Sequence, residues 1–359
     1  LGVFLAVIFF LLFSISRPIL LEETLPQKKR TSNKGLYITS YVAQSPAFLN
    51  HILSEAKKSK LDTIVVDAKR FLEDDLLLAI KEKKLNPQTR ATSNKWFAKL
   101  VKRLHHQGFI VVARLVVFKD DHLVIARPDL GVKKGRGEGG LYRDLKGGKW
   151  ADPYSAEVRL YNALIAEKAA LCGVDEVQFD YIRFPAERGA RQAVYPFHQE
   201  GVSKVEAINA FLKEAKERLD KYQTSIAVDI FGVTAWQSKN DIEMLGQDLK
   251  KMAPYIDVLC PMLYPSHFHA GYDGFDNPGS YPYYFLYTGL WKMQQMLSGE
   301  SVAIVPWLQG FNLRSPNFGP TYILDQIKAC QDGQAAGFLV WNARNRYEVA
   351  FDALRQERN

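Results

Sequence analysis

The chain has 359 residues, of which 47% are hydrophobic and 24% are charged. This composition excludes a disordered polypeptide, and the length suits one large domain or two ordinary ones. The net charge of +8 is not accompanied by any nucleic-acid recognition motif, so we expect no nucleic-acid partner.

Residues 1–21 have the character of a targeting segment. Residues 1–13 are apolar almost throughout, and the first charge is Arg17. The run is shorter than the roughly 20 residues of a membrane span and resembles the apolar region of a secretory signal, which can remain uncleaved as an anchor. A buried element of the fold is the alternative. The polar residues 22–34 predict a linker to a single domain over 35–359. We therefore expect a protein that is secreted or anchored to the outer face of the cytoplasmic membrane, with its N-terminal segment touching the bilayer.

After the linker, apolar strand-like runs alternate with amphipathic helical stretches. The predicted strands are, in chain order, 36–41, 63–67, 109–118, 176–180, 225–231, 257–262, 302–308 and 337–341. The predicted helices are 46–58, 94–107, 155–171, 202–222, 242–252, 284–297 and 322–331, with a short closing helix after the last strand. Eight such βα units predict an α/β fold of the (β/α)₈ TIM barrel type. A doubly wound open sheet is the alternative, but its Gly-rich phosphate turn is missing after the first strand.

Polar residues gather at the ends of the predicted strands. Strand side chains alternate between two faces, and this parity directs one set of polar groups into the barrel lumen. The set comprises Asp67, Arg114, Gln178, Asp180, Asp229 and Gln309. The long loops 119–150, 182–201 and 264–283 emerge at the same carboxyl-terminal face, where barrels build their clefts. Several polar side chains converging on one mouth indicate a ligand site.

Asp180 and Asp229 end neighbouring predicted strands. Glycosidic-bond hydrolysis uses two carboxyl groups about 5–10 Å apart, one ionised and the other kept protonated by burial and by its neighbour's charge. The ionised group attacks the anomeric carbon or activates water, and the protonated group protonates the leaving oxygen. The alternative is a structural ion pair with Arg114 or Arg183. Asp67 can orient a sugar hydroxyl, pair with a lysine, or act as the second carboxylate.

Aromatic residues are predicted around the same mouth, where sugars pack their apolar faces on rings. They are Tyr181, Phe231, Trp236, Tyr264, Trp307 and Trp341, and a core position is the alternative for each. His267 and His269 form an H-x-H pair that can bind a metal, but no Asp–His set accompanies it. We therefore assign His267 a substrate hydrogen bond or a general acid role, and expect no metal.

Segments along the whole domain resemble those of a known family. They read KGLYITSYVAQSP, TIVVDAK, ARLVVFKD, WADPYSAEVRLYN, DEVQFDYIRFP, VDIFG, LGQD, DVLCPMLYPSHF, PWLQGF and GFLVWNARNRY. The chain resembles the putative glycoside hydrolase domain family, bacterial TIM barrels long catalogued as a domain of unknown function. The resemblance implies a (β/α)₈ barrel, a carbohydrate-cleaving activity, and export or membrane anchoring. It also implies that Asp180 is the nucleophile and that a residue of the fifth or sixth strand is the acid.

The sequence therefore predicts a glycoside hydrolase that acts on a polysaccharide or cell-wall glycan. Asp180 is the predicted nucleophile or base and Asp229 the predicted acid/base. The predicted substrate-binding residues are Asp67, Arg114, Gln178, Tyr181, Arg183, Tyr264, His267, Gln309 and Asn342, with Trp307 and Trp341 as stacking platforms. We expect a monomer without a cofactor. The alternatives are a non-catalytic glycan-binding barrel of the cell envelope, or an envelope assembly protein with a flat apolar patch.

Overall fold

The computed structural model describes residues 33–135, 139–187, 189–236 and 238–357. The predicted targeting segment and nearly all of the predicted linker lie outside these residues. The last two linker residues, Asn33 and Lys34, instead begin the first strand. Within the described ranges, no helix is both long and apolar enough to cross a bilayer.

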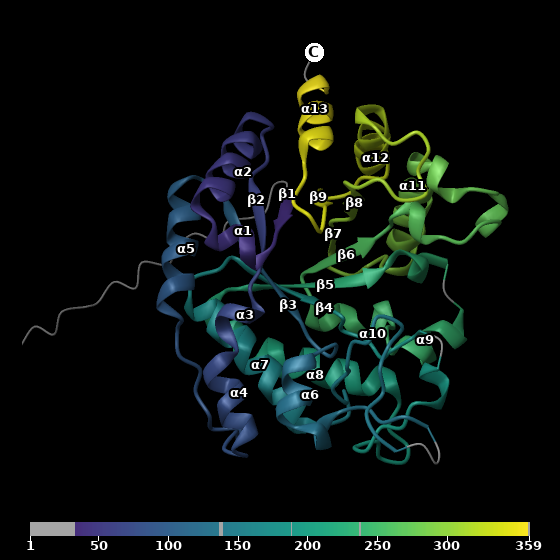
Figure 1. Cartoon of the computed structure of the whole chain (residues 1–359). Coiled ribbons are helices and arrows are strands. Elements are labelled where there is room, and N and C mark those ends of the chain that lie inside the picture. The colour runs from purple at the N-terminus through teal and green to yellow at the C-terminus, as the bar shows by residue number, and fades with distance from the viewer. Residues whose placement is uncertain (1–32, 136–138, 188, 237, 358–359) are drawn as a thin grey trace, which may run out of the picture. The chain divides into compact units, whose positions relative to one another are not determined.

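Nine strands of the described chain form one parallel sheet that curls into a barrel-like shape (Figure 1). The strands are β1 Asn33–Ile38, β2 Thr63–Asp67, β3 Ile110–Val116, β4 Glu176–Asp180, β5 Ser225–Phe231, β6 Val258–Met262, β7 Ala303–Ile304, β8 Trp307–Gln309 and β9 Gly337–Trp341. Their order in the sheet is β7-β6-β5-β4-β3-β2-β1-β9-β8. Consecutive strands are thus neighbours from β1 to β7, as expected for repeated βα units, and β9 pairs with β1.

The predicted seventh strand, 302–308, is two short strands. β7 pairs with β6, and β8 pairs with β9. Between them, the N–H of Val305 donates to Leu259 O (2.9 Å), and Pro306 O accepts from Leu339 N (2.9 Å). Proline has no N–H to donate, which interrupts the strand pairing at this point. Both ends of the sheet therefore lie on one short segment of chain.

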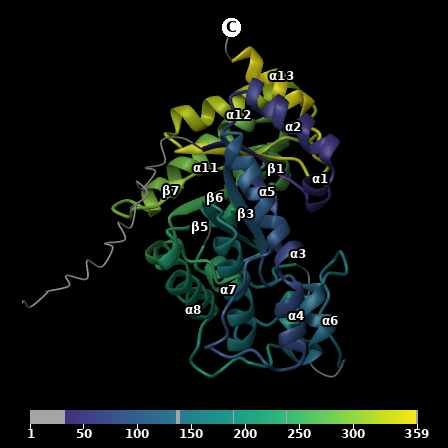
Figure 2. The same cartoon turned by 90° about the vertical axis from the view of Figure 1, so that its left-hand side faces the viewer.

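Helices surround the outer face of the curled sheet, with α2, α12 and α13 together above it and α4, α7 and α8 below it in the views of Figures 1 and 2. The α-helices of the described ranges are α1 Ser40–Gln44, α2 Pro46–Lys58, α3 Lys69–Leu72, α4 Asp74–Lys81, α5 Lys95–His106, α6 Asp121–Ala126, α7 Ala156–Leu171, α8 Lys204–Leu219, α9 Lys239–Leu245, α10 Leu249–Met252, α11 Pro282–Met296, α12 Pro320–Asp332 and α13 Glu348–Gln356. The last helix, α13, packs against α2 as well as α12. The last helix of the described chain therefore contacts one of the first helices.

Two predicted boundaries differ from the structure for local reasons. The first strand was expected to reach residue 41, but it ends at Ile38 because Thr39 caps α1, accepting the N–H of Val42 (3.2 Å). The predicted helix 242–252 is interrupted at Gly246, whose φ of 76° ends α9 in the left-handed region. The short helices α3, α4 and α6 were not predicted.

The apolar residues form two separate cores. The larger lies between the sheet and its helices, and includes Ile64, Val66, Val111 and Ala113. The smaller fills the interior of the curled sheet, with Tyr37, Val65, Val112, Ala227, Val258, Cys260, Val305, Trp307 and Leu339 among its members. Successive strand residues alternate between the two cores, as the period of two predicts. Strand residues on the same face as the inner core therefore point into the interior of the curled sheet.

Candidate active site

A single guanidinium on β3 lies close to three carboxyl groups, which belong to β2, β4 and β5. Arg114 on β3 donates from Nη1 to Asp67 Oδ1 (3.2 Å) and from Nη2 to Asp180, and its Nε lies 4.0 Å from Asp229 Oδ2. The Arg114 side chain is only 7% exposed. One positive charge is thus shared unequally among three carboxyl groups, with Asp67 and Asp180 in direct contact and Asp229 farther away.

Asp180 is fixed by the way β4 ends. Its Oδ1 accepts the backbone N–H of the next residue, Tyr181, at 2.6 Å, while Arg114 binds Oδ2. Tyr181 has a φ of 52°, in the left-handed region that non-glycine residues seldom adopt. Such backbone conformations concentrate at functional sites. The turn after Asp180 therefore holds the carboxylate of Asp180 in a defined orientation at the end of β4.

Asp229 occupies a different environment. It is 2% exposed, and its Oδ1 accepts the indole N–H of Trp307 at 2.6 Å. Burial raises the pKa of Asp229 well above its usual value, and the charge of Asp180 raises it further, while Arg114 and the Trp307 hydrogen bond lower it. The two carboxyl groups thus differ, one ion-paired and one driven toward the protonated form. Such inequality is the arrangement that acid/base chemistry needs.

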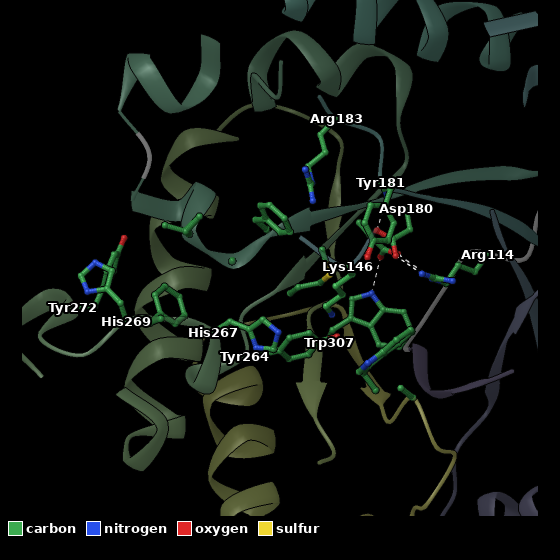
Figure 3. Close-up of a pocket in the computed structure, with 18 residues that line it drawn as sticks. Arg114, Lys146, Asp180, Tyr181, Arg183, Tyr264, His267, His269, Tyr272 and Trp307 are labelled. Atoms are coloured by element: carbon green, nitrogen blue, oxygen red, sulfur yellow. Dashed lines mark hydrogen bonds and ion pairs between the residues drawn. The ribbon is translucent and has the colours of Figure 1, made fainter. Parts of the chain in front are cut away.

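Both carboxyl groups open into a cavity of about 530 Å³ at the barrel mouth (Figure 3). The predicted site residues that line it are Arg114, Asp180, Tyr181, Arg183, Asp229, Tyr264, His267, Trp307 and Trp341. Asp180, Arg114 and Trp307 lie close together in Figure 3, and His269 and Tyr272 lie away from them across the cavity. The cavity therefore extends well beyond the carboxyl pair.

Four predicted substrate-binding residues do not line the cavity. Asp67 lies behind Arg114 and accepts from Tyr37 (3.3 Å), and Gln178 is fully buried deeper in the interior, with no polar partner among the described residues. Gln309 accepts from Ser266 N (3.1 Å) and donates to Ser315 Oγ (2.9 Å). Gln309 thus joins the loop after β6 to the loop after β8.

Asn342 is the fourth of these residues, and its amide is used within the protein. Its Nδ2 donates to Gly310 O (2.7 Å) and to Arg346 O (2.9 Å), and its Oδ1 accepts from Arg344 N (2.9 Å). All of its polar atoms have protein partners, so the expected substrate contact does not match its position. It ties the loop after β9 to the loop after β8.

The two predicted stacking platforms differ in accessibility. Trp307 is 1% exposed and meets Trp341 edge to face, with ring centroids 5.5 Å apart. Trp341 is partly exposed and stacks on Tyr37 with centroids 4.1 Å apart. The Arg114 guanidinium lies 5.2 Å from the Trp341 ring. Trp341 is therefore the more accessible ring, whereas Trp307 is buried and donates its indole N–H to Asp229.

His267 faces the cavity as a neutral ring. It packs on Tyr264 and Phe311, with centroids 5.1 and 6.1 Å away, and its Nδ1 lies 3.2 Å from Ser266 Oγ. Burial lowers the pKa of His267, and the charges of Lys146 and Arg314 lower it further. Elsewhere in the described chain, as here, no three His, Cys, Asp or Glu residues are grouped to hold a metal ion.

Sequence reasoning did not identify several residues of the cavity wall. They are Lys146, Gly232, Val233, Met262, Phe268, Tyr272 and Ala343, and His269, named only as a possible metal ligand, also lines the cavity. Met262 ends β6, so strand-end position was a usable signal for it. Lys146 lies within the long loop 119–150, and only the length of that loop pointed to the mouth.

Comparison with known proteins adds two findings. A family model described as "Putative glycosyl hydrolase domain" matches residues 35–347. The fold is similar to the glycoside hydrolase domain of PgaB (BpsB) from Bordetella bronchiseptica, at 12% identity and a TM-score of 0.60, covering 90% of this chain and 99% of that chain. It is also similar to the C-terminal domain of a putative chitinase from Desulfitobacterium hafniense, at 12% identity and a TM-score of 0.55, covering 92% and 100%.

A third similar structure is the α-galactosidase TtGalA from Thermus thermophilus, at 14% identity and a TM-score of 0.53, covering 91% of this chain and 62% of that chain. Identities this low show a shared fold alone. No curated protein matches the sequence.

Proposed function

Because its residues 35–347 match the family model, the chain belongs to the family described as a putative glycosyl hydrolase domain, and we propose that it hydrolyses O-glycosidic bonds in a polysaccharide or cell-wall glycan. The observation that carries this proposal is the unequal pair of carboxyl groups, Asp180 held by Arg114 and Asp229 buried with a raised pKa. An exported or envelope-anchored protein, which the apolar residues 1–13 favour, would meet such glycans.

The proposed reaction divides its steps between these two residues. Asp229 gives its proton to the leaving glycosidic oxygen as the bond to the anomeric carbon breaks. Asp180 either attacks that carbon directly or takes a proton from a water molecule that attacks it. Water supplies the hydroxyl group of the product and, in the complete cycle, the proton that returns to Asp229. Both groups approach one guanidinium, which keeps their separation below the upper limit of about 10 Å that such chemistry uses.

A non-catalytic glycan-binding barrel is the second candidate, and one observation favours it. The ion pair of Asp180 with Arg114 reduces the nucleophilicity of the carboxylate. Asp180 and Asp229 would then accept hydrogen bonds from sugar hydroxyls, with Trp341 packing against a sugar face.

A screen of purified bacterial envelope polysaccharides separates the two functions. We expect the wild-type protein to release new reducing ends from at least one of them, and a variant carrying both Asp180→Asn and Asp229→Asn to release none. Binding of a glycan by both proteins without cleavage by either would establish the binding barrel and overturn the hydrolase proposal.

The pH dependence of cleavage should report Asp229. A general acid works only while it carries its proton, so kcat is expected to fall as pH rises through the raised pKa of Asp229. The measurement is kcat against pH at saturating glycan, corrected for stability at each pH. A rate that keeps increasing into the alkaline range would contradict the assignment of Asp229 as the acid.

Trp307→Phe is expected to lower kcat about tenfold, the cost of one hydrogen bond to a charged group. The indole N–H stabilises the ionised form of Asp229, so its loss should also move the alkaline limit of the pH profile to higher pH. Trp341→Phe is the matched control, because Trp341 lies beside Trp307 and has no hydrogen bond to Asp229. A pH limit displaced equally by both substitutions would show that the hydrogen bond is not the cause.

A further inference from the structure

A tight turn in the loop 119–150 is organised by one buried carboxylate. Asp144, whose side chain is 3% exposed, accepts the backbone N–H groups of Lys146 and Gly148, each at 2.9 Å. It also accepts the indole N–H of Trp150 (3.3 Å) and forms an ion pair with Lys119 (2.7 Å). These contacts fix the turn from both ends, so the backbone position from which its cavity-lining side chain extends is well defined.

That side chain is Lys146, which reaches into the cavity in Figure 3. No carboxylate of a described residue lies within 4.0 Å of its Nζ. The two other strongly basic residues of the cavity are engaged: Arg114 pairs with Asp180, and Arg183 pairs with Glu187 (3.2 Å). Among the described residues, Lys146 is thus the cavity cation without such a partner.

The wall around His267 carries positive charge without a matching negative one. The charges that act on His267 are those of Lys146, which lines the cavity beside it, and of Arg314 in the loop after β8. The remaining neighbours are the rings of Tyr264 and Phe311 and the hydroxyl of Ser266. Both cations lower the pKa of the imidazole, in addition to the effect of burial. An anion placed here would relieve the repulsion between these groups.

We propose that Lys146 and His267 form a subsite for the carboxylate of an acidic sugar residue in the glycan. The proposal rests on the proposed function for its premise that the ligand is a glycan. One ammonium and one imidazole match a single negative charge with two oxygens, whereas phosphate groups carry up to two charges and favour arginine clusters. On binding, the carboxylate favours the protonated imidazole, so His267 takes up a proton and becomes a second charged donor.

Titration of the histidine ring signals by NMR tests this subsite directly. The probe is sodium glucuronate, with glucose as the neutral control and sodium chloride to keep the ionic strength constant. The His267 signal is assigned by its loss in His267→Asn. We expect glucuronate to move the titration of His267 to higher pH and glucose to leave it in place. Lys146→Gln should abolish the effect of glucuronate, and Lys146→Arg should retain it.

Lys149→Gln is the matched control, because Lys149 belongs to the same loop, pairs with Asp121 (2.9 Å) and does not line the cavity. It should behave as wild type. The subsite is overturned when glucuronate leaves the His267 titration unchanged, or when it shifts the titration equally in wild type and Lys146→Gln.

Cleavage assays separate this proposal from the hydrolase proposal. Glycans that are cleaved equally fast before and after chemical reduction of their carboxyl groups would remove the subsite and leave the hydrolase intact. A glucuronate effect that depends on Lys146, together with no cleavage of any glycan, would support the subsite and overturn the hydrolase proposal.

Discussion

Asp180→Asn is expected to lower the rate of glycan cleavage by about 10⁴-fold or more, the usual scale for removing a reacting group. An amide neither attacks the anomeric carbon nor takes a proton from water. The fold should survive, because the amide side chain would keep an oxygen for the Tyr181 N–H and Arg114 would keep Asp67 as a partner. Initial rates of reducing-end release, measured on wild type and variant with matched circular dichroism spectra, check this result.

Asp67→Asn is the control that separates loss of a reacting carboxylate from displacement of Arg114. Asp67 also accepts a hydrogen bond from Arg114, at 3.2 Å, but it does not line the cavity. We expect its substitution to lower the rate less than about tenfold, because the asparagine oxygen can still accept from Arg114 and only the charge of the acceptor is lost. Equal losses in the two variants would indicate that both act by displacing Arg114, and Asp180 would then not be the reacting group.

Asp229→Asn should have opposite effects on catalysis and stability. Loss of the general acid is expected to lower the cleavage rate by about 10²–10⁴-fold. The folded-state pKa of Asp229 is raised, so its contribution to stability is complete below the unfolded-state pKa of about 3.9 and is lost as pH rises through the folded-state pKa. Asparagine does not ionise, so the variant escapes this loss and should be at least as stable as wild type at neutral and alkaline pH.

Urea unfolding across a range of pH tests the stability half of this prediction. The free energy of unfolding of wild type should fall relative to that of Asp229→Asn as pH rises. A variant that is less stable than wild type by the same amount at every pH would show that Asp229 contributes a fixed contact rather than a titrating one. Cleavage of an aryl glycoside of the preferred sugar checks the other half, since a good leaving group needs little acid assistance and should be less affected.

Period-two alternation predicted the inward side of each strand because parallel strands have only two faces. Val65 and Val112 therefore fall in the inner core, and Asp180 and Asp229 reach the same guanidinium. Alternation does not reveal which other groups compete for a side chain at the mouth. Gln309 points toward the mouth, but loop atoms that are distant in sequence take up its hydrogen bonds.

Two features of the site depend on tertiary contacts that no local pattern encodes. The turn that carries Lys146 is local, since Asp144 accepts the N–H groups of Lys146 and Gly148, but its attachment at the mouth also depends on the ion pair of Asp144 with the distant Lys119. Trp307 was expected to be a platform because its residue type suits stacking. Its actual role depends on Asp229, which lies 78 positions away in the chain and across the interior of the sheet.

The break between β7 and β8 has a consequence for how the molecule fluctuates. β7 and β8 lie at the two edges of the sheet, and each pairs fewer residues with its neighbour than the other strand pairings of the described chain do. Trp307 begins β8 and carries the indole that binds Asp229. Transient opening of the sheet should begin here, and deuterium should enter the amides of this segment early. A partly opened molecule would therefore lose the hydrogen bond that positions its acid while most of the sheet remained intact.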